Sequence, residues 1–348
     1  MFLGIEIGGT KLQLGVGRGD GTLVALARYD VRPKGGAEGI LAQIEAAARV
    51  LIARHGISAV GIGFGGPVDS TSGVVVKSHH VAGWDDFPLV DWCRRVLMLP
   101  AVLENDCDAA GLAEARHGAG RGRNVVFYVT VGTGIGGGLV VGGEIFRASG
   151  HGAAEIGHLR PGLHADRPDQ TVESLASGWG IAAAAQDRLS DPISHAFVPL
   201  TSGLRGTKPD DVRQRLIETE EAEAEYAADL LDRCDGKLDQ LTAQMVSQAA
   251  GEGNEIAREV LSRACQALGW AIAQTITLVA PEAIVIGGGV PSMDESLFLV
   301  PLRLAVDRYV FPPFVGTFQI LPAELGEQVV VHGAIAAAAE KRTVDTLP

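Results

Sequence analysis

The sequence has few cysteines, few aromatic residues and no long uncharged hydrophobic run. Its four cysteines, Cys93, Cys107, Cys234 and Cys265, are far apart and form no C-x-x-C pair. This spacing predicts neither a disulfide framework nor a thiolate zinc site, and it indicates a reducing compartment, which we expect to be the cytoplasm. No apolar run reaches the length of a membrane span and no signal-like segment opens the chain, so we expect neither anchoring nor export.

Net positive charge is also lacking. The chain has 42 acidic residues against 29 Lys and Arg, and its formal net charge is −13. This balance argues against nucleic acid or an anionic membrane as the main partner. Hydrophobic residues make up 47% of the chain and aromatic residues only 5%. Such a composition is typical of an α/β protein, and 348 residues are enough for two domains that each bury a core.

Glycine, in contrast, is abundant, and two glycine-rich turns each lie between apolar stretches that predict strands. Backbone N–H groups at glycines can approach an anion closely, threonine hydroxyls add donors, and a lysine adds positive charge. We therefore predict that the two turns hold the phosphates of a nucleotide. The turns are Gly8, Gly9, Thr10 and Lys11 in the first, and Gly132, Thr133 and Gly134 in the second.

A third glycine cluster supports the same interpretation. Gly287, Gly288 and Gly289 follow a short apolar run at 284–286, and we expect a nucleotide base or ribose to lie against their bare backbone. The alternative is that all these glycines belong to ordinary turns of a chain with 46 glycines. The repeated Gly-Thr pair and the third cluster favour nucleotide binding.

Two other nucleotide motifs are weighed and rejected. Gly132, Gly134 and Gly137 satisfy G-x-G-x-x-G, but a dinucleotide-binding turn opens a helix. Here residues 139–146 predict a second strand. A P-loop requires G-x-x-x-x-G-K-[ST], which does not occur. The sequence instead predicts strand, glycine turn and strand, twice, as in two similar lobes.

Hydrophobic periodicity gives a coarse map of these lobes. The segment 118–123 is rich in glycine and arginine, and we take it as the link between them. The first lobe is predicted to span 1–120, the second 121–332, and the last helix, at about 333–345, returns to the first lobe. Strands are predicted at 2–7, 12–17, 22–29, 59–64, 101–103 and 124–131, and helices at 40–55, 177–189, 222–231, 256–280 and 333–340.

Polar residues at the ends of predicted strands are the candidates for chemistry, because open α/β sheets place ligands there. Asp106 follows the strand at 101–103 and is the candidate general base, with Asn105 beside it to bind a sugar hydroxyl. On spacing alone an Asn-Asp pair is more typical of a turn or helix cap. Glu155, His158 and Glu173 form a second polar group that suits the hydroxyls of a pyranose.

Taken together, these residues resemble the ROK family of sugar kinases and repressors along nearly the whole chain. The resemblance rests on both phosphate turns, on 104–106, on 155–158 with Glu173, and on 281–289. It implies an actin-like ATPase fold of the ribonuclease H-like class, with a cleft between two lobes. It also implies ATP- and Mg²⁺-dependent phosphorylation of a hexose, glucokinase-like, at the 6-hydroxyl, by a homodimer.

Site roles follow from the resemblance by position. Asp106 is then the general base. The sugar is held by Asn105, Glu155, His158 and Glu173, and Gly65 and Gly66 line its pocket. The nucleotide is bound by Gly8, Gly9, Thr10, Lys11, Gly132, Thr133, Gly134, Gly287 and Gly288, and Glu6 acts indirectly on Mg²⁺.

The chain departs from the family pattern at three places. Glu6 stands where many members have Asp, and His80 begins a segment that often starts with Asn. In the zinc loop His164, Asp166 and Thr171 occupy the three cysteine positions. We therefore do not expect zinc, and we expect ordinary packing to hold the loop.

Alternative functions remain at this stage. The sugar is taken to be glucose-like, with N-acetylhexosamine or fructose as alternatives. A non-catalytic, sugar-sensing ROK protein is the alternative of another class. A repressor is not expected, because the first strand is predicted to start at residue 2 and leaves no room ahead of it for a DNA-reading element.

Overall fold

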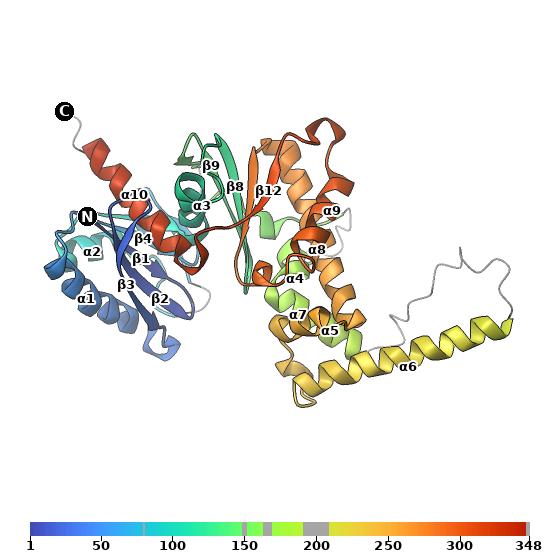
Figure 1. Cartoon of the computed structure of the whole chain (residues 1–348). Helices are drawn as coiled ribbons and strands as arrows, with labels where there is room; N and C mark the ends of the chain where they lie inside the picture. The colour runs from blue at the N-terminus through green and yellow to red at the C-terminus, as the bar shows by residue number, and fades with distance from the viewer. Residues whose placement is uncertain (79–80, 148–151, 163–168, 191–208, 346–348) are drawn as a thin grey trace.

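The computed structural model describes residues 1–78, 81–147, 152–162, 169–190 and 209–345 of the chain. Within these residues the chain forms two five-stranded sheets flanked by helices, as Figure 1 shows. No helix of this described part is long and apolar enough to cross a bilayer. The elements of the first half are β1 (Phe2–Ile7), β2 (Lys11–Gly17), β3 (Leu23–Asp30), α1 (Gly36–Arg54), β4 (Ala59–Phe64), β5 (Val68–Asp69), β6 (Val74–Val75), α2 (Leu89–Leu97), β7 (Ala101–Asn105) and α3 (Asp106–His117).

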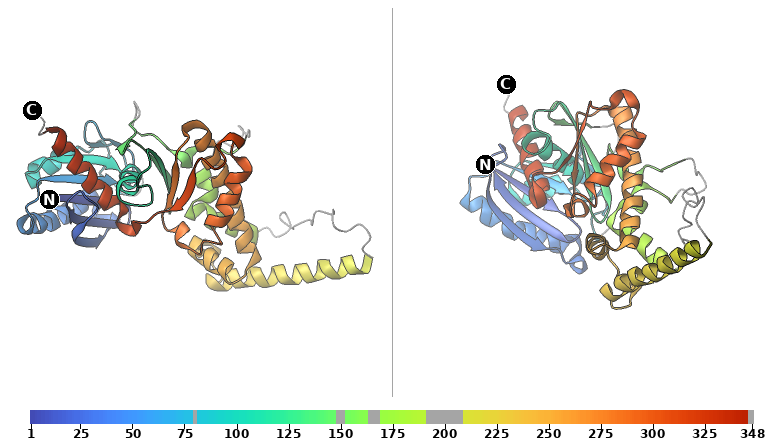
Figure 2. Two further views of the ribbon diagram at one scale, coloured as in Figure 1. Left: turned by 45° about the horizontal axis from the view of Figure 1, so that its top comes forward. Right: turned by 45° about the vertical axis from the view of Figure 1, so that its right-hand side comes forward.

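The second half begins with the strands β8 and β9 and ends with a long helix. Its elements are β8 (Val125–Val131), β9 (Ile135–Val141), β10 (Glu144–Ile145), α4 (Val172–Ala176), α5 (Gly178–Ser190), α6 (Pro209–Arg233), α7 (Ala243–Gly251), α8 (Glu255–Val279), β11 (Ala283–Gly287), α9 (Leu299–Tyr309), β12 (Gln319–Pro322) and α10 (Val329–Asp345). In both views of Figure 2, α6 extends away from the rest of the molecule. The predicted helix at 222–231 is the last part of α6.

The first sheet has the strand order β3-β2-β1-β4-β7. β1 is antiparallel to β2, whereas β1, β4 and β7 run parallel to one another. Their carboxyl ends therefore lie at one edge of the sheet. The first glycine turn follows β1, Gly65 follows β4, and Asn105 ends β7. The topology thus brings three predicted parts of the site to the same edge.

The second sheet repeats this pattern with the order β10-β9-β8-β11-β12. β8 and β9 form an antiparallel hairpin, and β8, β11 and β12 are parallel. The second glycine turn connects β8 to β9, which confirms that it opens a strand rather than a helix. Gly287 ends β11 at the same edge. The sheet edge in this half therefore also carries two predicted nucleotide segments.

Helices α3 and α10 lie between the two sheets (Figure 1). α10 packs against α3, β1 and β4, and the approach is very close. A methyl group at Gly61 of β4 would lie 1.7 Å from the carbonyl oxygen of Ala334, and one at Gly333 would lie 1.7 Å from that of Ala109. Glycine is therefore required at both positions where these backbones pack, which accounts for part of the glycine-rich composition. The division of the chain into lobes at residue 120 remains our proposal.

Two predicted elements are placed differently in the structure. The strand expected at 139–146 begins at Ile135 and ends at Val141, where two glycines at positive φ turn the chain. Its first half is rich in glycine because α3 lies on it: a methyl group at Gly138 would lie 2.5 Å from the carbonyl oxygen of Cys107. The last helix begins at Val329 rather than at 333, since three consecutive valines disguise its first turn.

Candidate active site

Three neighbouring cavities are together lined by every predicted site residue. We call them the acidic cavity (about 510 Å³), the central cavity (about 880 Å³) and the helical cavity (about 1140 Å³). The acidic and central cavities share Asp106, Cys107 and Thr130, and the central and helical cavities share Gly132 and Thr133. The three therefore form one connected surface.

The predicted residues divide between the acidic and central cavities. The acidic cavity is lined by Glu6, Lys11, Asp106, Gly287 and Gly288. The central cavity is lined by Gly8, Gly9, Thr10, Gly65, Gly66, Asn105, Asp106, Gly132, Thr133, Gly134, Glu155, His158 and Glu173. The structure thus brings the first and second glycine turns, the Asn-Asp pair and the expected sugar-binding residues together around a single cavity.

Asn105 is both a helix cap and a cleft residue. Its side-chain oxygen accepts a hydrogen bond from the backbone N–H of Cys107 at 2.8 Å and caps α3. The cap preference inferred from spacing is therefore confirmed. Its amide nitrogen donates to the carbonyl oxygen of Gly66 at 3.0 Å, which ties α3 to the loop after β4. These bonds fix the direction in which Asp106, the first residue of α3, enters the cavity.

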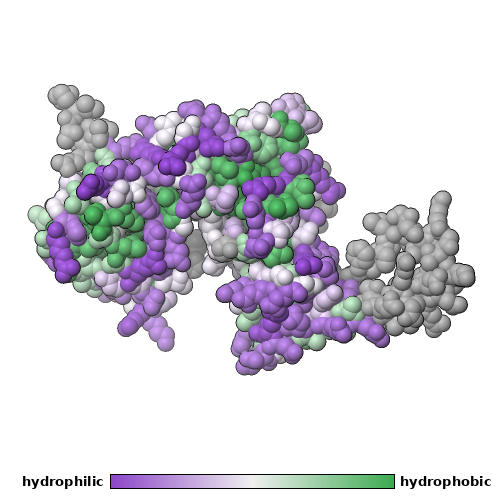
Figure 3. All heavy atoms as spheres, in the orientation of Figure 1, coloured by the Kyte–Doolittle hydropathy of each residue, from purple (hydrophilic) through white to green (hydrophobic). Residues whose placement is uncertain are grey.

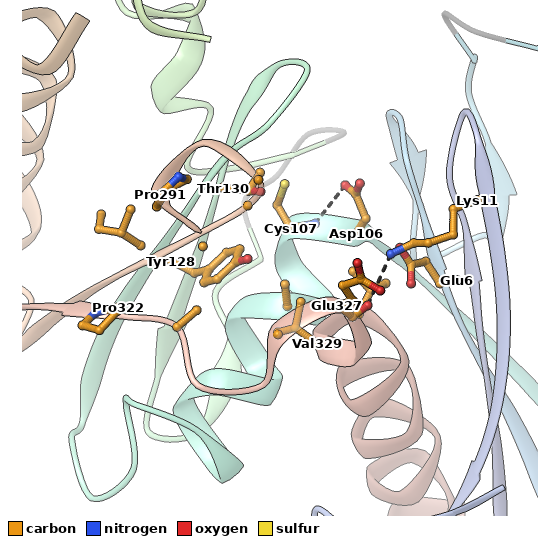
Figure 4. Close-up of a pocket in the computed structure, with 18 residues that line it drawn as sticks. Glu6, Lys11, Asp106, Cys107, Tyr128, Thr130, Pro291, Pro322, Glu327 and Val329 are labelled. Carbon is orange, nitrogen blue, oxygen red and sulfur yellow. Dashed lines mark hydrogen bonds and ion pairs between the residues drawn. The ribbon is translucent and has the colours of Figure 1, made fainter. Parts of the chain in front are cut away.

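Asp106 combines a buried carboxyl group with a helix N-terminus. Its Oδ1 accepts a hydrogen bond from the backbone N–H of Cys107 at 2.9 Å, as Figure 4 shows. Burial raises the pKa of Asp106, the hydrogen bonds from Cys107 and the backbone oppose this, and the nearby Glu155 carboxylate adds to the increase. A carboxylate with a raised pKa accepts a proton more readily than an exposed aspartate, which is the property of a general base.

Glu6, which also lines the acidic cavity, is held by two partners. Lys11 Nζ lies 3.0 Å from Glu6 Oε1, and Gln13 Nε2 donates to Glu6 Oε2 at 3.0 Å. Burial raises the pKa of Glu6, against the attraction of Lys11, and the charge of Asp106 raises it further. Figure 4 shows Lys11 directed into the cavity, where its Nζ also donates to the carbonyl oxygen of Glu327 at 3.3 Å.

Glu173 connects the expected sugar-binding residues to the second glycine turn. Its Oε2 accepts the backbone N–H of Ile135 at 2.9 Å, immediately after that turn. A methyl group at Gly134 would lie only 2.6 Å from the same oxygen. Glycine is therefore needed at 134 for the carboxylate to reach its place. One carboxylate thus contacts the turn predicted for phosphate and the cavity predicted for sugar.

A capping box holds the short helix that carries Glu173. The Thr171 hydroxyl accepts the backbone N–H of Ser174 at 3.1 Å, and the Ser174 hydroxyl accepts the backbone N–H of Thr171 at 2.9 Å. Thr171 occupies one of the cysteine positions of the family zinc loop, and here it anchors α4 by hydrogen bonding. His80, His164 and Asp166 lie outside the described residues. Among the described residues no group of three His, Cys, Asp or Glu could hold a metal ion.

The structure adds residues that sequence reasoning missed. Arg147 makes a bidentate ion pair with buried Glu104, at 2.7 Å for each bond, and so ties the loop before Glu155 to the strand before Asp106. Trp179 is 48% exposed and lines the helical cavity. In the sequence, Glu104 is visible only as an acidic residue before Asn105, and Trp179 only as a tryptophan after a Ser-Gly pair. Neither pattern identifies a role without the fold.

Comparisons with known proteins agree with this geometry. The sequence model of the ROK family matches residues 2–341. A glucokinase from Thermotoga maritima is 29% identical over 335 residues, which cover 96% of this chain and 95% of that protein. The crystal structure of a ROK family glucokinase from Streptomyces griseus in complex with glucose and AMPPNP is 30% identical, covers 97% of this chain and 99% of that chain, and has a TM-score of 0.76.

A more distant structure supports the fold alone. The ROK hexokinase from Thermus thermophilus is 24% identical, with a TM-score of 0.74 and coverage of 99% of both chains. These similarities, together with the two repeated sheets, confirm the predicted actin-like ATPase fold. They also confirm the family to which the residue patterns pointed.

Proposed function

The chain belongs to the ROK family, and we propose that it is an ATP-dependent sugar kinase that phosphorylates a glucose-like hexose at its 6-hydroxyl. One observation carries this proposal: Asp106, the four polar sugar-binding candidates and both phosphate turns line one central cavity. N-acetylhexosamine and fructose are the alternative acceptors. Small differences in hydrogen bonding to the sugar can decide between such substrates.

In this mechanism Asp106 accepts the proton of the sugar hydroxyl. The hydroxyl oxygen attacks the γ-phosphorus of ATP, the bond from that phosphorus to the β–γ bridging oxygen breaks, and ADP leaves. Asn105, Glu155, His158 and Glu173 hold the sugar so that one hydroxyl faces Asp106. Positioning of this kind supplies much of the rate enhancement in phosphoryl transfer.

The glycine turns suit the ATP phosphates. At Gly132 a Cβ would meet no protein atom within 4 Å, so the backbone lies open to the cavity for close approach of an anion. In the third glycine cluster, Gly288 has φ of 100° and packs against the end of β8, so glycine is needed there by the backbone packing itself. Trp179 and its neighbours in the helical cavity provide an apolar surface on which we place the nucleoside.

The acidic cavity suits Mg²⁺. In phosphoryl-transfer sites this ion binds through one or two carboxylates, waters and the substrate phosphates, so a cluster of three protein ligands is not required. Glu6 and Asp106 line one cavity and their charges interact. Glu6 would hold the ion through water while Asp106 stays free to act as the base, and the ion would neutralise the charge of the phosphates.

We further propose that the protein is a cytoplasmic homodimer. Its cysteines are all buried and unpaired. Apolar side chains are exposed along α9 and at the end of α8, namely Val300, Leu304 and Leu278. Figure 3 shows hydrophobic surface over this region. A second copy of the chain would bury this surface.

The test is coupled ADP release with Mg-ATP across a panel of hexoses and N-acetylhexosamines, for the native chain and for Asp106→Asn. We expect turnover with one class of sugar and a loss of kcat of about 10³-fold in the variant, since a general base contributes about 10²–10⁴-fold. Asp91→Asn, an exposed position on α2, is the control. Sugar binding by calorimetry without turnover would favour the sensor, and turnover that survives in Asp106→Asn would contradict the mechanism.

A further inference from the structure

Two segments of the chain connect one sheet to the other, and both lie beside the side chain of Glu114. Residues 118–124 lead from α3 to β8 and form the first crossing, and residues 323–328 lead from β12 to α10 and form the second crossing. Glu114, in the third turn of α3, is completely buried between them with 0% exposure. Few acidic residues are buried to this degree unless their charge is compensated.

The Glu114 carboxylate is compensated by backbone amides from both crossings. Oε2 accepts the N–H of Ala119 at 2.8 Å in the first crossing. Oε1 accepts the N–H of Glu324 at 3.0 Å and that of Leu325 at 2.9 Å in the second crossing. None of the ion pairs found among the described residues includes Glu114. The Glu114 side chain therefore joins two segments that are about 200 residues apart in the chain.

The local backbone is fitted to this arrangement. A methyl group at Gly118 would lie 2.0 Å from Oε2 of Glu114, so the first crossing begins with a residue that leaves room for the carboxylate. The carbonyl oxygen of Glu114 also accepts the N–H groups of Gly118 and Gly120, at 3.1 and 2.9 Å. Glutamine would place an NH₂ group among these N–H donors and leave at least one of them unpaired.

We infer that Glu114 is the pivot residue between the lobes: it holds the two crossings together so that they bend as one hinge when the lobes close on substrates. It is a positioning residue, because it lies two turns along the helix that begins with Asp106 and touches no part of the cavities. Hinge residues of this kind are remote from the chemistry and change turnover when substituted. The kinetic consequence rests on the proposed kinase function, whereas the mechanical coupling does not.

The experiment compares the full-length chain with Glu114→Gln by hydrogen–deuterium exchange and by kinetics. We expect backbone amides of both crossings, 118–124 and 323–328, to exchange at least about tenfold faster, while β1 and β11 stay protected. We expect kcat with glucose and Mg-ATP to fall about tenfold, with both KM values changed by less than about twofold. If Glu114 stabilised only the residues next to it in sequence, the substitution would speed exchange in the first crossing alone.

Glu282→Gln is the matched control. Glu282 Oε2 accepts the backbone N–H of Asn124 in the first crossing but has no bond to the second crossing. Removing this carboxylate should therefore speed amide exchange in the first crossing only. If Glu114→Gln does not fold, Glu114→Asp keeps the charge, shortens the reach by one methylene and is expected to show the same coupled loosening. The inference would be overturned if amide exchange in Glu114→Gln rose in one crossing alone. It would also be overturned if exchange rose in both crossings while kcat stayed at the native value. If the native chain phosphorylates no sugar, the exchange result still decides the pivot, and only the kinase proposal falls.

Discussion

At the scale of single residues, the cleft is dominated by carboxyl groups that burial makes weaker acids. Burial is the largest cause of the raised pKa at Glu6, Asp106 and Glu155. Lys11 opposes the effect at Glu6, and His158 opposes it at Glu155. Because the acids of the cleft raise the pKa of one another, a cation that enters with the nucleotide would stabilise all of them. In the proposed mechanism that cation is Mg²⁺, bound together with ATP.

Asp108 carries the clearest pH dependence. Burial, with repulsion from Glu104, raises its pKa from 3.8 to about 7, and its Oδ1 has no hydrogen-bond partner among the described residues. Because the folded-state pKa exceeds the unfolded value, the folded state binds this proton more tightly. The contribution of Asp108 to stability is therefore constant below about pH 4, falls as the pH rises from about 4 to 7, and stays low above that. The upper limit of the loss is about 4 kcal/mol.

Asp108→Asn should remove this slope. We expect the decrease in the free energy of unfolding between pH 5 and pH 8, measured by urea titration, to shrink by about 1–3 kcal/mol in the variant. Asp232→Asn, at an exposed position of α6, should leave the decrease as it is in the native chain. An equal decrease in the native chain and in Asp108→Asn would show that the carboxyl group titrates normally.

At the scale of elements, the sequence predicts strands best where both faces are buried. β4 is buried at every position and has its predicted bounds, because a continuous apolar run leaves no ambiguity. β9 was misplaced because the packing of α3 demands glycine where a strand would carry β-branched residues. The Asn-Asp cap was predictable because capping is local in sequence. The capping box of α4 was not, since its threonine stands at a position that the family resemblance assigns to zinc.

Thr171→Val should test whether that box positions Glu173. Loss of an N-cap hydroxyl costs about 1 kcal/mol, so we expect the sugar KM to rise about fivefold with little change in the KM for ATP. Thr171→Ser, which retains the hydroxyl, should restore the native value. Asn254→Ala removes the side-chain cap of α8, which lies away from the three cavities. A fivefold rise of the sugar KM in this control too would attribute the effect to general loss of stability.

At the scale of the whole molecule, the residues that line the cavities could be picked from the sequence one by one, whereas the contacts that assemble them could not. Each glycine turn and the Asn-Asp pair occupy consecutive positions, so their chemistry is visible in a short window. The bonds from Glu114 to the second crossing join residues 210 and 211 positions apart, and no pattern in the sequence reports them. Long-range hydrogen bonds of this kind depend on topology, which a single sequence leaves open.

The proposed homodimer is a property of the same scale, and it depends on a surface that the fold leaves uncovered. Leu304 on α9 is 65% exposed and Leu278 at the end of α8 is 85% exposed, which is costly for residues of this type unless a partner covers them. A carboxylate at the centre of a dimer interface would have to be desolvated without a partner. Leu304→Asp is therefore expected to convert a dimer to a monomer in sedimentation velocity.

Met98→Asp is the matched control, because Met98 is 81% exposed in the first lobe, at the end of α2. Its φ of 56° is tolerated by Asp at least as well as by Met, so this change adds the same charge without strain. We expect it to sediment as the native chain does. Dissociation by both variants would indicate a general effect of charge, and a native chain that is monomeric at micromolar concentration would contradict the proposed dimer itself. Dissociation by Leu304→Asp alone would place the interface on α9, a helix that lines none of the three cavities, so that each subunit could close its cleft independently of the other.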